Sequence, residues 1–370
     1  MKVAVTLEQC WHRVPGGTAS SVLGMLDGFA SMARADQDVE LIGVAARHGD
    51  DPPAPWTPSI AVRQLPLRRP LLYEAWHAPL RVWPAVERAT GPVDVVHATA
   101  IAYPITRAPV VVTIHDLAFL HDARRATRHG HRFFRRGTDL ARRNAALVVV
   151  PSQATADDCV AAGFASDRIR IVPWGVRSAR ATADDIERAR RAHRIDRPYV
   201  LFTGTVEPRK NLPRLLDAFA SLGRDDVDLV LIGPEGWNED VGEQLRRLGS
   251  KVHTLGFVAD ADRDALMAGA QVFCYPSLSE GFGLPVLEAM AQGAPIVTAS
   301  GTATAEVIGD AGVTVDPRDT AAIAHAVAQL LDDRALASRL GHAALERAAT
   351  FSWERTAHGY LDAYREAARR

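Results

Sequence analysis

Residues 274–295 read CYPSLSEGFGLPVLEAMAQGAP, and this stretch decides the fold of the chain. It begins at the end of an apolar run, continues through a glycine-rich turn and enters an apolar segment opened by Leu284 and Pro285. Proline is favoured in the first turn of a helix, where its missing N–H costs little. The stretch therefore predicts a strand, a tight turn and a helix, the repeating unit of a parallel α/β sheet.

Two glutamates flank this turn. Glu280 precedes the glycines, and Glu288 lies about one turn inside the expected helix. Glycines let backbone N–H groups approach a ligand, and a helix N-terminus attracts anions. One glutamate can therefore meet sugar hydroxyls and the other ribose hydroxyls, on either side of a diphosphate. The diphosphate would rest on the turn backbone, formed by Gly281, Phe282, Gly283 and Leu284. A buried turn with a surface glutamate on each side is the alternative.

Short β-branched runs alternate with helical patterns along the chain, which predicts parallel sheets with helices on both faces. In the first half the expected strands are residues 3–6, 39–44, 60–64, 93–97, 110–115, 147–150 and 169–172. In the second half they are residues 199–203, 229–232, 251–254, 271–275, 295–298 and 313–315. The architecture is thus two doubly wound domains, which bind ligands at the carboxyl ends of their strands.

Composition agrees with two ordinary soluble domains. The chain has 370 residues and a formal net charge of −1, so no global charge directs it to nucleic acid. Its three cysteines form no C-x-x-C pair and fit a reducing compartment. We expect no signal peptide, because Glu8 comes before any apolar core could form, and no run approaches the ~18–20 apolar residues that span a bilayer. These features predict a cytoplasmic protein.

A second motif, TGTVEPRKN at residues 203–211, follows an expected strand and precedes a helix. Gly204 ends the strand, and Arg209 and Lys210 place two cations at its carboxyl end. Such a pair can neutralise a departing diphosphate, work that other enzymes give to a metal. Lysine occurs only three times in the chain, so an ammonium retained here indicates that its geometry matters. The alternative is a solvated helix start, although the helix dipole disfavours cations there.

With these motifs the chain resembles the retaining glycosyltransferases of family 4, whose hallmark is two glutamates separated by seven residues, as Glu280 and Glu288 are. The resemblance implies the GT-B fold, in which two Rossmann-like α/β domains face a cleft. It also implies metal-independent transfer of a hexose from a nucleoside diphosphate sugar, with retention of configuration and no other cofactor. The acceptor would be a hydroxyl of a glycan, a lipid or a small molecule. Residues 111–118 and 203–211 look most like bacterial mannosyltransferases that use GDP-mannose.

The domain boundaries follow from the strand pattern and this resemblance. Residues 1–177 form the acceptor domain, 178–198 a polar linker that is helical in pattern and has no strand, and 199–350 the nucleotide-sugar domain. Residues 351–370 form a terminal helix capped by Ser352. In the resembled family this helix crosses back to the first domain, and packing on its own domain is the alternative.

The resemblance adds further residues to the site. His115 emerges at the carboxyl end of an apolar strand, where the family histidine contacts the donor sugar, and a structural histidine is the alternative. Gly16 and Gly17 follow the first strand and precede a helix expected to start near Ser20; they are assigned to the donor phosphate or the acceptor, although any tight turn would explain them. The backbone of Val258 is expected near the nucleotide base. The expected catalytic residues are thus His115, Glu280, Arg209 and Lys210.

No metal site is expected. The Asp-x-Asp pairs at 36–38 and 226–228 precede strands, and the pair at 260–262 indicates a turn and cap before a helix at 263–270. Two other functions stay open for the same fold, a sugar-nucleotide epimerase and a non-catalytic interaction subunit.

Residues 121–143 are rich in arginine, with eight arginines against Asp122 and Asp139. Phe133 and Phe134 lie inside this stretch. A basic helix with embedded aromatic residues can lie on an anionic membrane or receive a phosphorylated lipid. The sequence therefore raises peripheral contact with the inner membrane face as a hypothesis. The alternative is a solvated basic face whose phenylalanines pack on the sheet.

Overall fold

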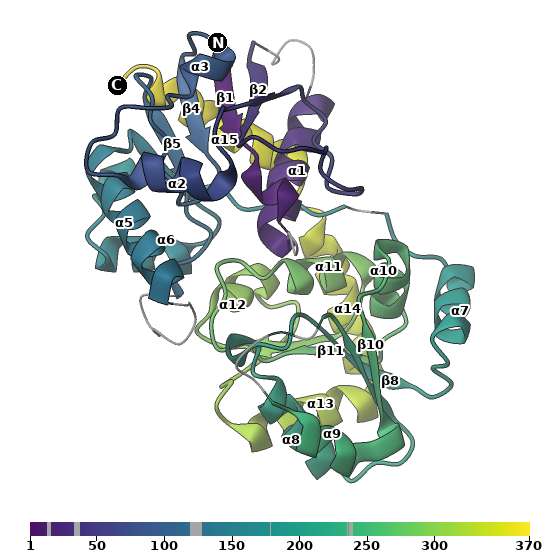
Figure 1. The fold of residues 1–370 in the computed structure, drawn as a ribbon. Coiled ribbons are helices and arrows are strands. Elements are labelled where there is room, and N and C mark those ends of the chain that lie inside the picture. Colours follow the sequence, from purple (N-terminus) through teal and green to yellow (C-terminus); the bar gives the residue numbers. More distant parts are fainter. Residues whose placement is uncertain (13–15, 33–37, 119–127, 178, 235, 237–239) are drawn as a thin grey trace. The chain divides into compact units, whose positions relative to one another are not determined.

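The computed structural model describes residues 1–12, 16–32, 38–118, 128–177, 179–234, 236 and 240–370 (Figure 1). The chain divides into two compact units. Unit 1 comprises Met1–Gly175 together with Phe351–Arg370, and unit 2 comprises Val176–Thr350.

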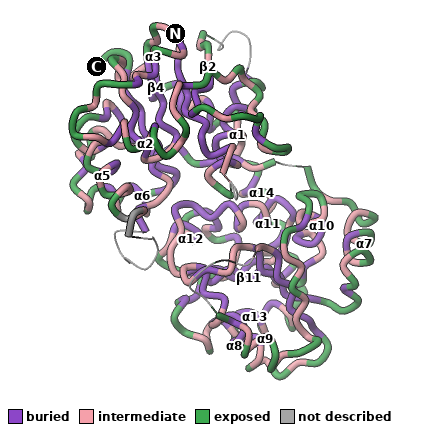
Figure 2. The backbone as a smooth tube through the Cα atoms, viewed as in Figure 1, coloured by how far each residue is buried: buried purple, intermediate pink, exposed green. Residues whose placement is uncertain are grey.

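Unit 1 is built on a seven-stranded parallel sheet in the order β3-β2-β1-β4-β5-β6-β7. Its strands are β1 Lys2–Thr6, β2 Glu40–Ala45, β3 Val62–Gln64, β4 Val95–Ala98, β5 Val110–Thr113, β6 Leu147–Val150 and β7 Ile169–Ile171. Its α-helices are α1 Gly16–Ser31, α2 Arg69–His77, α3 Glu87–Thr90, α5 Arg128–Asn144, α6 Gln153–Ala161 and α15 Trp353–Ala367. The central strands are apolar at nearly every position, as expected where helices cover both faces (Figure 2).

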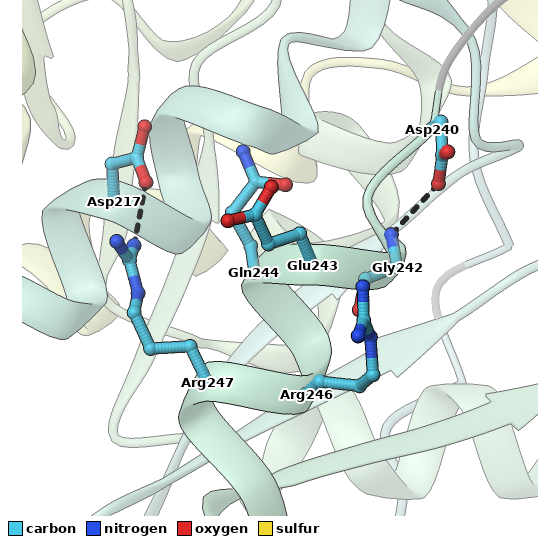
Figure 3. A pocket seen from close by; sticks show the side chains of 7 residues that line it. All are labelled: Asp217, Asp240, Gly242, Glu243, Gln244, Arg246 and Arg247. Carbon is cyan, nitrogen blue, oxygen red and sulfur yellow. Dashed lines mark hydrogen bonds and ion pairs between the residues drawn. The ribbon is translucent and has the colours of Figure 1, made fainter.

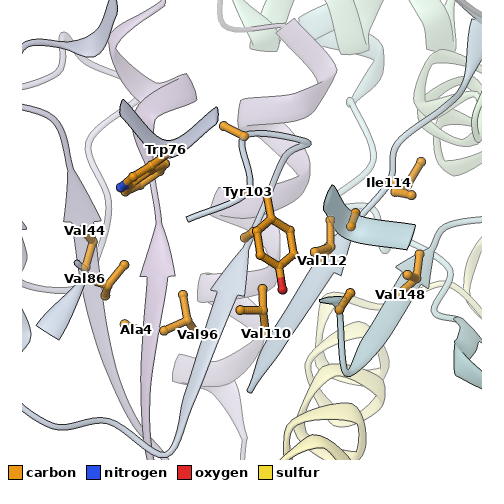
Figure 4. Close-up of a cluster of buried hydrophobic side chains, with 14 of the residues drawn as sticks. Ala4, Val44, Trp76, Val86, Val96, Tyr103, Val110, Val112, Ile114 and Val148 are labelled. Atoms are coloured by element: carbon orange, nitrogen blue, oxygen red, sulfur yellow. The ribbon is translucent and has the colours of Figure 1, made fainter. Parts of the chain in front are cut away.

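Alternate residues of these strands pack in two separate hydrophobic cores, one on each face of the sheet, because successive strand side chains point to opposite faces. Val110 and Val112 join a cluster with Trp76 and Tyr103 on one face (Figure 4). Val111 joins a cluster with residues of α1 and α15 on the other face. The sheet is therefore buried on both sides by packed side chains.

Unit 2 is built on a six-stranded parallel sheet in the order β10-β9-β8-β11-β12-β13. Its strands are β8 Tyr199–Thr203, β9 Asp228–Ile232, β10 Val252–Gly256, β11 Val272–Tyr275, β12 Ile296–Ala299 and β13 Val313–Val315. Its α-helices are α7 Ala183–Ala192, α8 Leu212–Ser221, α9 Gly242–Leu248, α10 Asp260–Ala268, α11 Leu284–Gln292, α12 Ala303–Ile308, α13 Thr320–Asp332 and α14 Arg334–Ala348. Every strand expected from the sequence is present, within two residues at either end.

Both sheets reverse their strand order at one point, between β1 and β4 in unit 1 and between β8 and β11 in unit 2. Open α/β sheets bind ligands in the crevice outside the carboxyl ends of the strands at such a switch point. The loops after β8 and β11 are the two motifs singled out in the sequence. The topology of unit 2 therefore brings these motifs to one edge of one sheet.

The terminal helix α15 belongs to unit 1, where it packs along α1. Its cap is Ser352, whose hydroxyl accepts the Arg355 N–H at 3.2 Å. Three glycines of unit 1 leave room for its first residue, because a Cβ on Gly24, Gly28 or Gly175 would lie 2.1–2.2 Å from an atom of Trp353. Of the two placements left open by the sequence, the structure has the one that returns to the first unit.

Some sequence predictions about local structure are wrong. Residues 179–198 of the expected linker lie in unit 2, and the helical pattern expected there is present as α7, which packs on α10. The helix after the first glycine pair begins at Gly16, so the pair forms its first turn instead of a preceding loop. The helix expected at 263–270 begins at Asp260, without a side-chain cap. Among the described residues, no helix is long and apolar enough to cross a membrane.

The basic helix α5 turns its phenylalanines inward. Phe133 stacks on Tyr73 and His77, with ring centroids 5.2 and 4.5 Å apart, and Phe133 and Phe134 both pack against the core of unit 1. The aromatic residues are partly buried and pack on the core, as the alternative expects. The part of the predicted membrane segment at 121–127 lies outside the described residues.

Candidate functional site

The loops that follow β8 and β11 are fastened to each other by backbone and side-chain hydrogen bonds. The Leu278 N–H donates to the Arg209 carbonyl at 2.7 Å. The buried Asn211 amide donates to the carbonyls of Pro276 and Pro317, at 2.9 and 2.6 Å. Asn211 has a left-handed backbone, with φ 60°, which asparagine tolerates better than most residues. These bonds hold the cations of one loop beside the carboxylate of the other.

Glu280 is the centre of an ionic cluster. One of its oxygens, Oε1, lies 2.7 Å from the Lys210 Nζ, and the other lies 2.5 Å from an Arg209 nitrogen. Oε1 also accepts the hydroxyls of Ser277 and Tyr275, at 2.6 and 3.0 Å. The Lys210 ammonium contacts the Tyr275 hydroxyl as well. Lys210 and Glu280 keep side-chain exposures of only 8% and 7%, so the lysine is not part of a solvated helix start.

The charges of this cluster stabilise one another. Burial raises the pKa of Glu280, but Arg209 and Lys210 outweigh it and hold the pKa at about 2. Burial lowers the pKa of Lys210, and the Glu280 carboxylate opposes that shift. Burial and then Glu280 raise the pKa of the Tyr275 hydroxyl well above its usual value, so it stays protonated as a donor. Glu207 pairs with Arg209 at 2.7 Å. The cluster thus presents fixed charges in a largely dry setting.

Two physical reasons favour glycine at position 283, in the turn before α11. Gly283 has φ 103°, a conformation that side chains rarely adopt, and an added Cβ would lie 2.6 Å from Thr304. Leu284 and Pro285 then open α11, as the sequence predicts. Gly281, Phe282, Gly283 and Leu284 are all buried. The positive end of the helix dipole therefore lies immediately after Glu280.

The backbone of Gly204 lies close to that of Gly233, and this approach requires glycine at position 233, since a Cβ on Gly204 itself would meet nothing closer than Phe202 at 3.4 Å. A Cβ on the neighbouring Gly233 would lie 2.1 Å from the Gly204 carbonyl oxygen, and the Gly204 N–H donates to the Ile232 carbonyl at 2.8 Å. Immediately before Gly204, the buried Thr203 hydroxyl has no hydrogen-bond partner among the described residues. This edge of the sheet therefore offers an unused hydroxyl beside the cationic loop.

Glu288 lies in a different electrostatic setting from Glu280. Its carboxylate is 3.5 Å from Arg263, a residue that also pairs with Asp260 and Asp264. Burial raises the pKa of Glu288 to about 7, because Arg263 does not fully offset the burial and the two aspartates. Its side chain retains 23% exposure. The two motif glutamates are thus inequivalent, one firmly ionised and one that titrates near neutrality.

The remaining predicted residues lie in three places. Val258 is buried at the end of the loop after β10, next to Phe257, which is 77% exposed. In unit 1, Gly16 has φ 58° and Gly17 follows it in the first turn of α1. His115 lies in the loop after β5. Its Nε2 donates to the Thr99 carbonyl at 2.7 Å, because a carbonyl can only accept.

This bond fixes the tautomer of His115. Burial lowers the pKa of the imidazole, so the neutral ring carries its proton on Nε2 and an acceptor lone pair on Nδ1. The buried Nδ1 has no partner among the described residues, and the ring lies against Trp174, with centroids 5.4 Å apart. His115 can therefore accept a hydroxyl proton in a hydrogen bond but is poorly suited to carry a positive charge.

A polar hollow of about 510 Å³ lies over α8 and α9, away from these motifs in the sequence (Figure 3). Charges of both signs line it, and its Arg247 and Asp217 pair at 2.8 Å. None of the predicted site residues lines it, so it is not part of the candidate site. Within the described ranges, no three side chains of His, Cys, Asp or Glu converge as a metal site would require.

Sequence reasoning missed several residues that organise the cluster. Tyr275 and Ser277 stand inside the stretch that decides the fold, yet only the structure reveals that their hydroxyls meet at Glu280. Asn211 and Arg263 also had no assigned role. An asparagine between a turn and a helix is a recognisable left-handed signal. The partner of Arg263 could not be found without the tertiary fold.

Two family models match the chain, one in each half. Residues 15–180 match Glycosyltransferase Family 4, and residues 184–347 match Glycosyl transferases group 1. Among curated proteins, the O-antigen chain mannosyltransferase B of Escherichia coli is 43% identical over 176 residues, 45% of each chain. The MMP alpha-(1->4)-mannosyltransferase of Mycolicibacterium hassiacum is 32% identical over 235 residues, covering 62% of this chain and 56% of that one. The chain thus matches about half the length of these curated relatives.

Solved structures show the same fold. Anabaena HepE in complex with UDP and glucose superimposes with a TM-score of 0.76 at 20% identity, over 98% of each chain. WaaG, a glycosyltransferase involved in lipopolysaccharide biosynthesis, has a TM-score of 0.73 at 19% identity, over 97% of this chain and 98% of that one. With both halves matched in sequence and both sheets matched in structure, the chain belongs to the glycosyltransferases of family 4 and has the GT-B fold.

Proposed function

We propose that this protein is a retaining, metal-independent hexosyltransferase that uses a nucleoside diphosphate sugar. One observation carries the proposal: Arg209 and Lys210 are held by Glu280 at the carboxyl end of β8, next to the glycine turn that opens α11. A pair of cations and a helix N-terminus form a favourable place for a diphosphate. We expect them to replace the divalent ion that other transferases use.

Negative charge grows on the diphosphate as the bond from the sugar to its phosphate breaks. Preorganised cations in a water-poor site stabilise such charge without having to reorganise. Lys210 fits this role, because hydrogen bonds to Tyr275 and Glu280 fix its ammonium before any ligand arrives. The unpartnered hydroxyl of Thr203 is a further donor on the same edge.

We assign Glu288 to the ribose hydroxyls and Glu280 to the hydroxyls of the sugar. Glu280 has a second part in this assignment, since it holds both cations in the donor-free protein. In unit 1, the lone pair of His115 Nδ1 is the acceptor that we assign to a hydroxyl of the sugar. We retain the backbone of Val258 near the base, and Gly16 and Gly17 at the donor phosphate or the acceptor.

Retention follows most simply from front-face displacement. The bond from the anomeric carbon to the phosphate oxygen breaks, and a bond to the acceptor oxygen forms on the same face. The departing phosphate takes the proton of the acceptor hydroxyl, so the step needs no protein nucleophile. The cluster supports this route. Arg209 and Lys210 are paired with the Glu280 carboxylate, and we expect the departing phosphate to compete with that carboxylate for both cations.

For the donor we propose GDP-mannose, and for the acceptor a hydroxyl of a glycan, a glycolipid or a natural product. The names of several curated relatives, including the two described above, support mannose, whereas others are D-inositol 3-phosphate glycosyltransferases. HepE was solved with UDP and glucose, so the base and the sugar must be measured. The three cysteines are buried and unpaired, which supports a reducing compartment such as the cytoplasm.

A donor screen tests the proposal. Purified protein is incubated with GDP-, UDP-, ADP- and dTDP-sugars, with and without a mixture of acceptor glycosides, and the free nucleotide is measured. We expect nucleotide release that is fastest with GDP-mannose, with slow hydrolysis when no acceptor is present. An epimerised nucleotide sugar would indicate an epimerase, and binding of donor without turnover would indicate an interaction subunit.

A further inference from the structure

The surface of unit 1 has a concentration of exposed apolar side chains that the proposed function does not use. Seven large hydrophobic residues are exposed among the described residues, and four of them fall between positions 71 and 83. These are Leu71, Leu80, Val82 and Trp83, with exposures of 60, 81, 80 and 44%. We call these four residues the apolar rim. Leu71 lies on α2, and the other three lie in the loop that follows it.

The loop is held so that its apolar side chains face outward. Arg81, between Leu80 and Val82, turns inward: its Nε donates to the Trp76 carbonyl at 2.8 Å, and its guanidinium lies 4.9 Å from the centre of the Tyr103 ring. These contacts of Arg81 anchor the loop between Leu80 and Val82, whose own side chains are 81% and 80% exposed. The exposure of Leu80 and Val82 is therefore built into the fold.

Arginines lie near the rim, and Glu74 on α2 is an exposed acid beside them. Arg68 is exposed at the start of α2, and Arg88 places its guanidinium 6.0 Å from the centre of the Trp83 ring. The basic helix α5 packs beside α2 through Phe133 and Tyr73 (Figure 1). Of its arginines, Arg132, Arg135 and Arg143 are exposed. One carboxylate oxygen of the nearby Glu87, Oε1, accepts hydrogen bonds from the Thr106 hydroxyl at 2.6 Å and from the Arg107 N–H at 2.8 Å.

We propose that the apolar rim inserts into the surface of a bilayer that carries anionic phospholipid, with α5 contributing arginines to the headgroups. Tryptophan favours the membrane–water interface, and leucine and valine gain by entering the acyl boundary. Each arginine near an anionic surface adds attraction that salt weakens. A stable protein interface involves about 20–30 residues on each side, far more than these four side chains offer. The proposal is independent of the donor or the reaction.

Vesicle co-sedimentation tests the proposal with the full chain. The probes are vesicles of phosphatidylcholine alone and of phosphatidylcholine mixed with phosphatidylglycerol. We expect binding to the mixed vesicles that falls as salt is added. Replacing the loop residues together (Leu80→Ser, Val82→Ser and Trp83→Ser) should weaken this binding at least about tenfold, since burial of even one of the three side chains contributes roughly a tenfold factor.

The matched control removes apolar side chains from another exposed part of unit 1. Val160 and Ile171 are 49% and 43% exposed, and Val160→Ser with Ile171→Ser should bind vesicles like the unaltered protein. Arg132→Ser with Arg135→Ser should weaken binding at low salt only. Thermal unfolding confirms that each variant is folded.

A direct readout places a fluorophore on the rim. The three native cysteines are buried, so a Leu80→Cys variant can be labelled at one position with an environment-sensitive dye. Its emission should rise and shift to the blue on mixed vesicles, while a dye at Val160→Cys should not respond. Equal recovery of the unaltered protein in the supernatant with and without anionic vesicles would overturn the proposal. So would a concentration-dependent dimer that the serine variant dissolves while vesicles bind neither form.

Discussion

The Lys210 ammonium and the Glu280 carboxylate, 70 positions apart in the chain, lie 2.7 Å from each other on the edge of one sheet. The same carboxylate oxygen accepts the hydroxyls of Ser277 and Tyr275. When no sugar nucleotide is bound, the Glu280 carboxylate therefore neutralises the cation that we expect a diphosphate to bind. A ligand must compete with a built-in anion, and this relationship sets the first two predictions.

Lys210→Ala should lower kcat by about 10²–10³, because the ammonium acts on charge that grows as the bond breaks. Its effect on donor KM should be smaller. Lys251→Ala is the matched control, since Lys251 lies far along the chain and pairs with Asp225 on the surface. Steady-state kinetics on both variants decide the matter, and near-normal kcat for Lys210→Ala would refute the assigned role.

Glu280→Gln should separate affinity from turnover. The amide keeps the size of the side chain but removes the charge that neutralises Arg209 and Lys210. We expect nucleoside diphosphate to bind more tightly, by several-fold at low salt, while kcat falls because the sugar hydroxyls lose a charged hydrogen-bond acceptor and keep only the weaker amide oxygen. Calorimetric titration with GDP checks the first half. Weaker binding of GDP by a folded variant would show that Glu280 does not compete with the ligand.

Glu288 should make donor binding depend on pH near neutrality. Burial raises its pKa to about 7, so the carboxylate forms as pH rises through that value and then accepts ribose hydroxyls more strongly. Donor affinity should therefore increase from pH 6 to 8, and Glu288→Gln should flatten this dependence of affinity on pH.

The stability of the protein should change with pH in the opposite direction. The native state binds the extra proton between the usual pKa of 4.5 and about 7, so the free energy of unfolding falls as pH rises across that window. If the donor affinity of Glu288→Gln depended on pH as steeply as that of the unaltered protein, Glu288 would not be the group that causes the pH dependence.

The sequence predicts strands well here because each is a short β-branched run between turn residues, buried on both faces. The sequence does not predict which side chains from distant parts of the chain contact each other. Nothing near Glu280 announces that Lys210 is its partner, and nothing near Phe133 announces that Tyr73 and His77 will cover its ring. The helical pattern at 178–198 is likewise visible in the sequence, but it does not reveal that α7 packs on α10 within unit 2.

Chelation tests the metal-independent part of the proposal. If Arg209 and Lys210 stabilise the departing diphosphate, turnover should be unchanged, within about twofold, after dialysis against EDTA. The measurement is nucleotide release with the best donor of the screen, before and after Mg²⁺ or Mn²⁺ is restored. Activity that disappears with EDTA and returns with either ion would assign the charge stabilisation to a metal.

Gly28→Ala should destabilise unit 1, although alanine is the better helix former. In an open helical position the change would stabilise the protein by up to about 1 kcal/mol. At Gly28 an added Cβ would lie 2.1 Å from the backbone oxygen of Trp353, and backbone cannot rotate away as a side chain can. We therefore expect a loss of about 1–3 kcal/mol, the cost of overpacking, with a lower Tm in thermal unfolding. Gly49→Ala is the matched control, because an added Cβ there meets nothing within 4 Å, and its stability should change by less than about 0.5 kcal/mol. A Gly28→Ala variant with a raised Tm would mean that the start of α15 does not lie against α1.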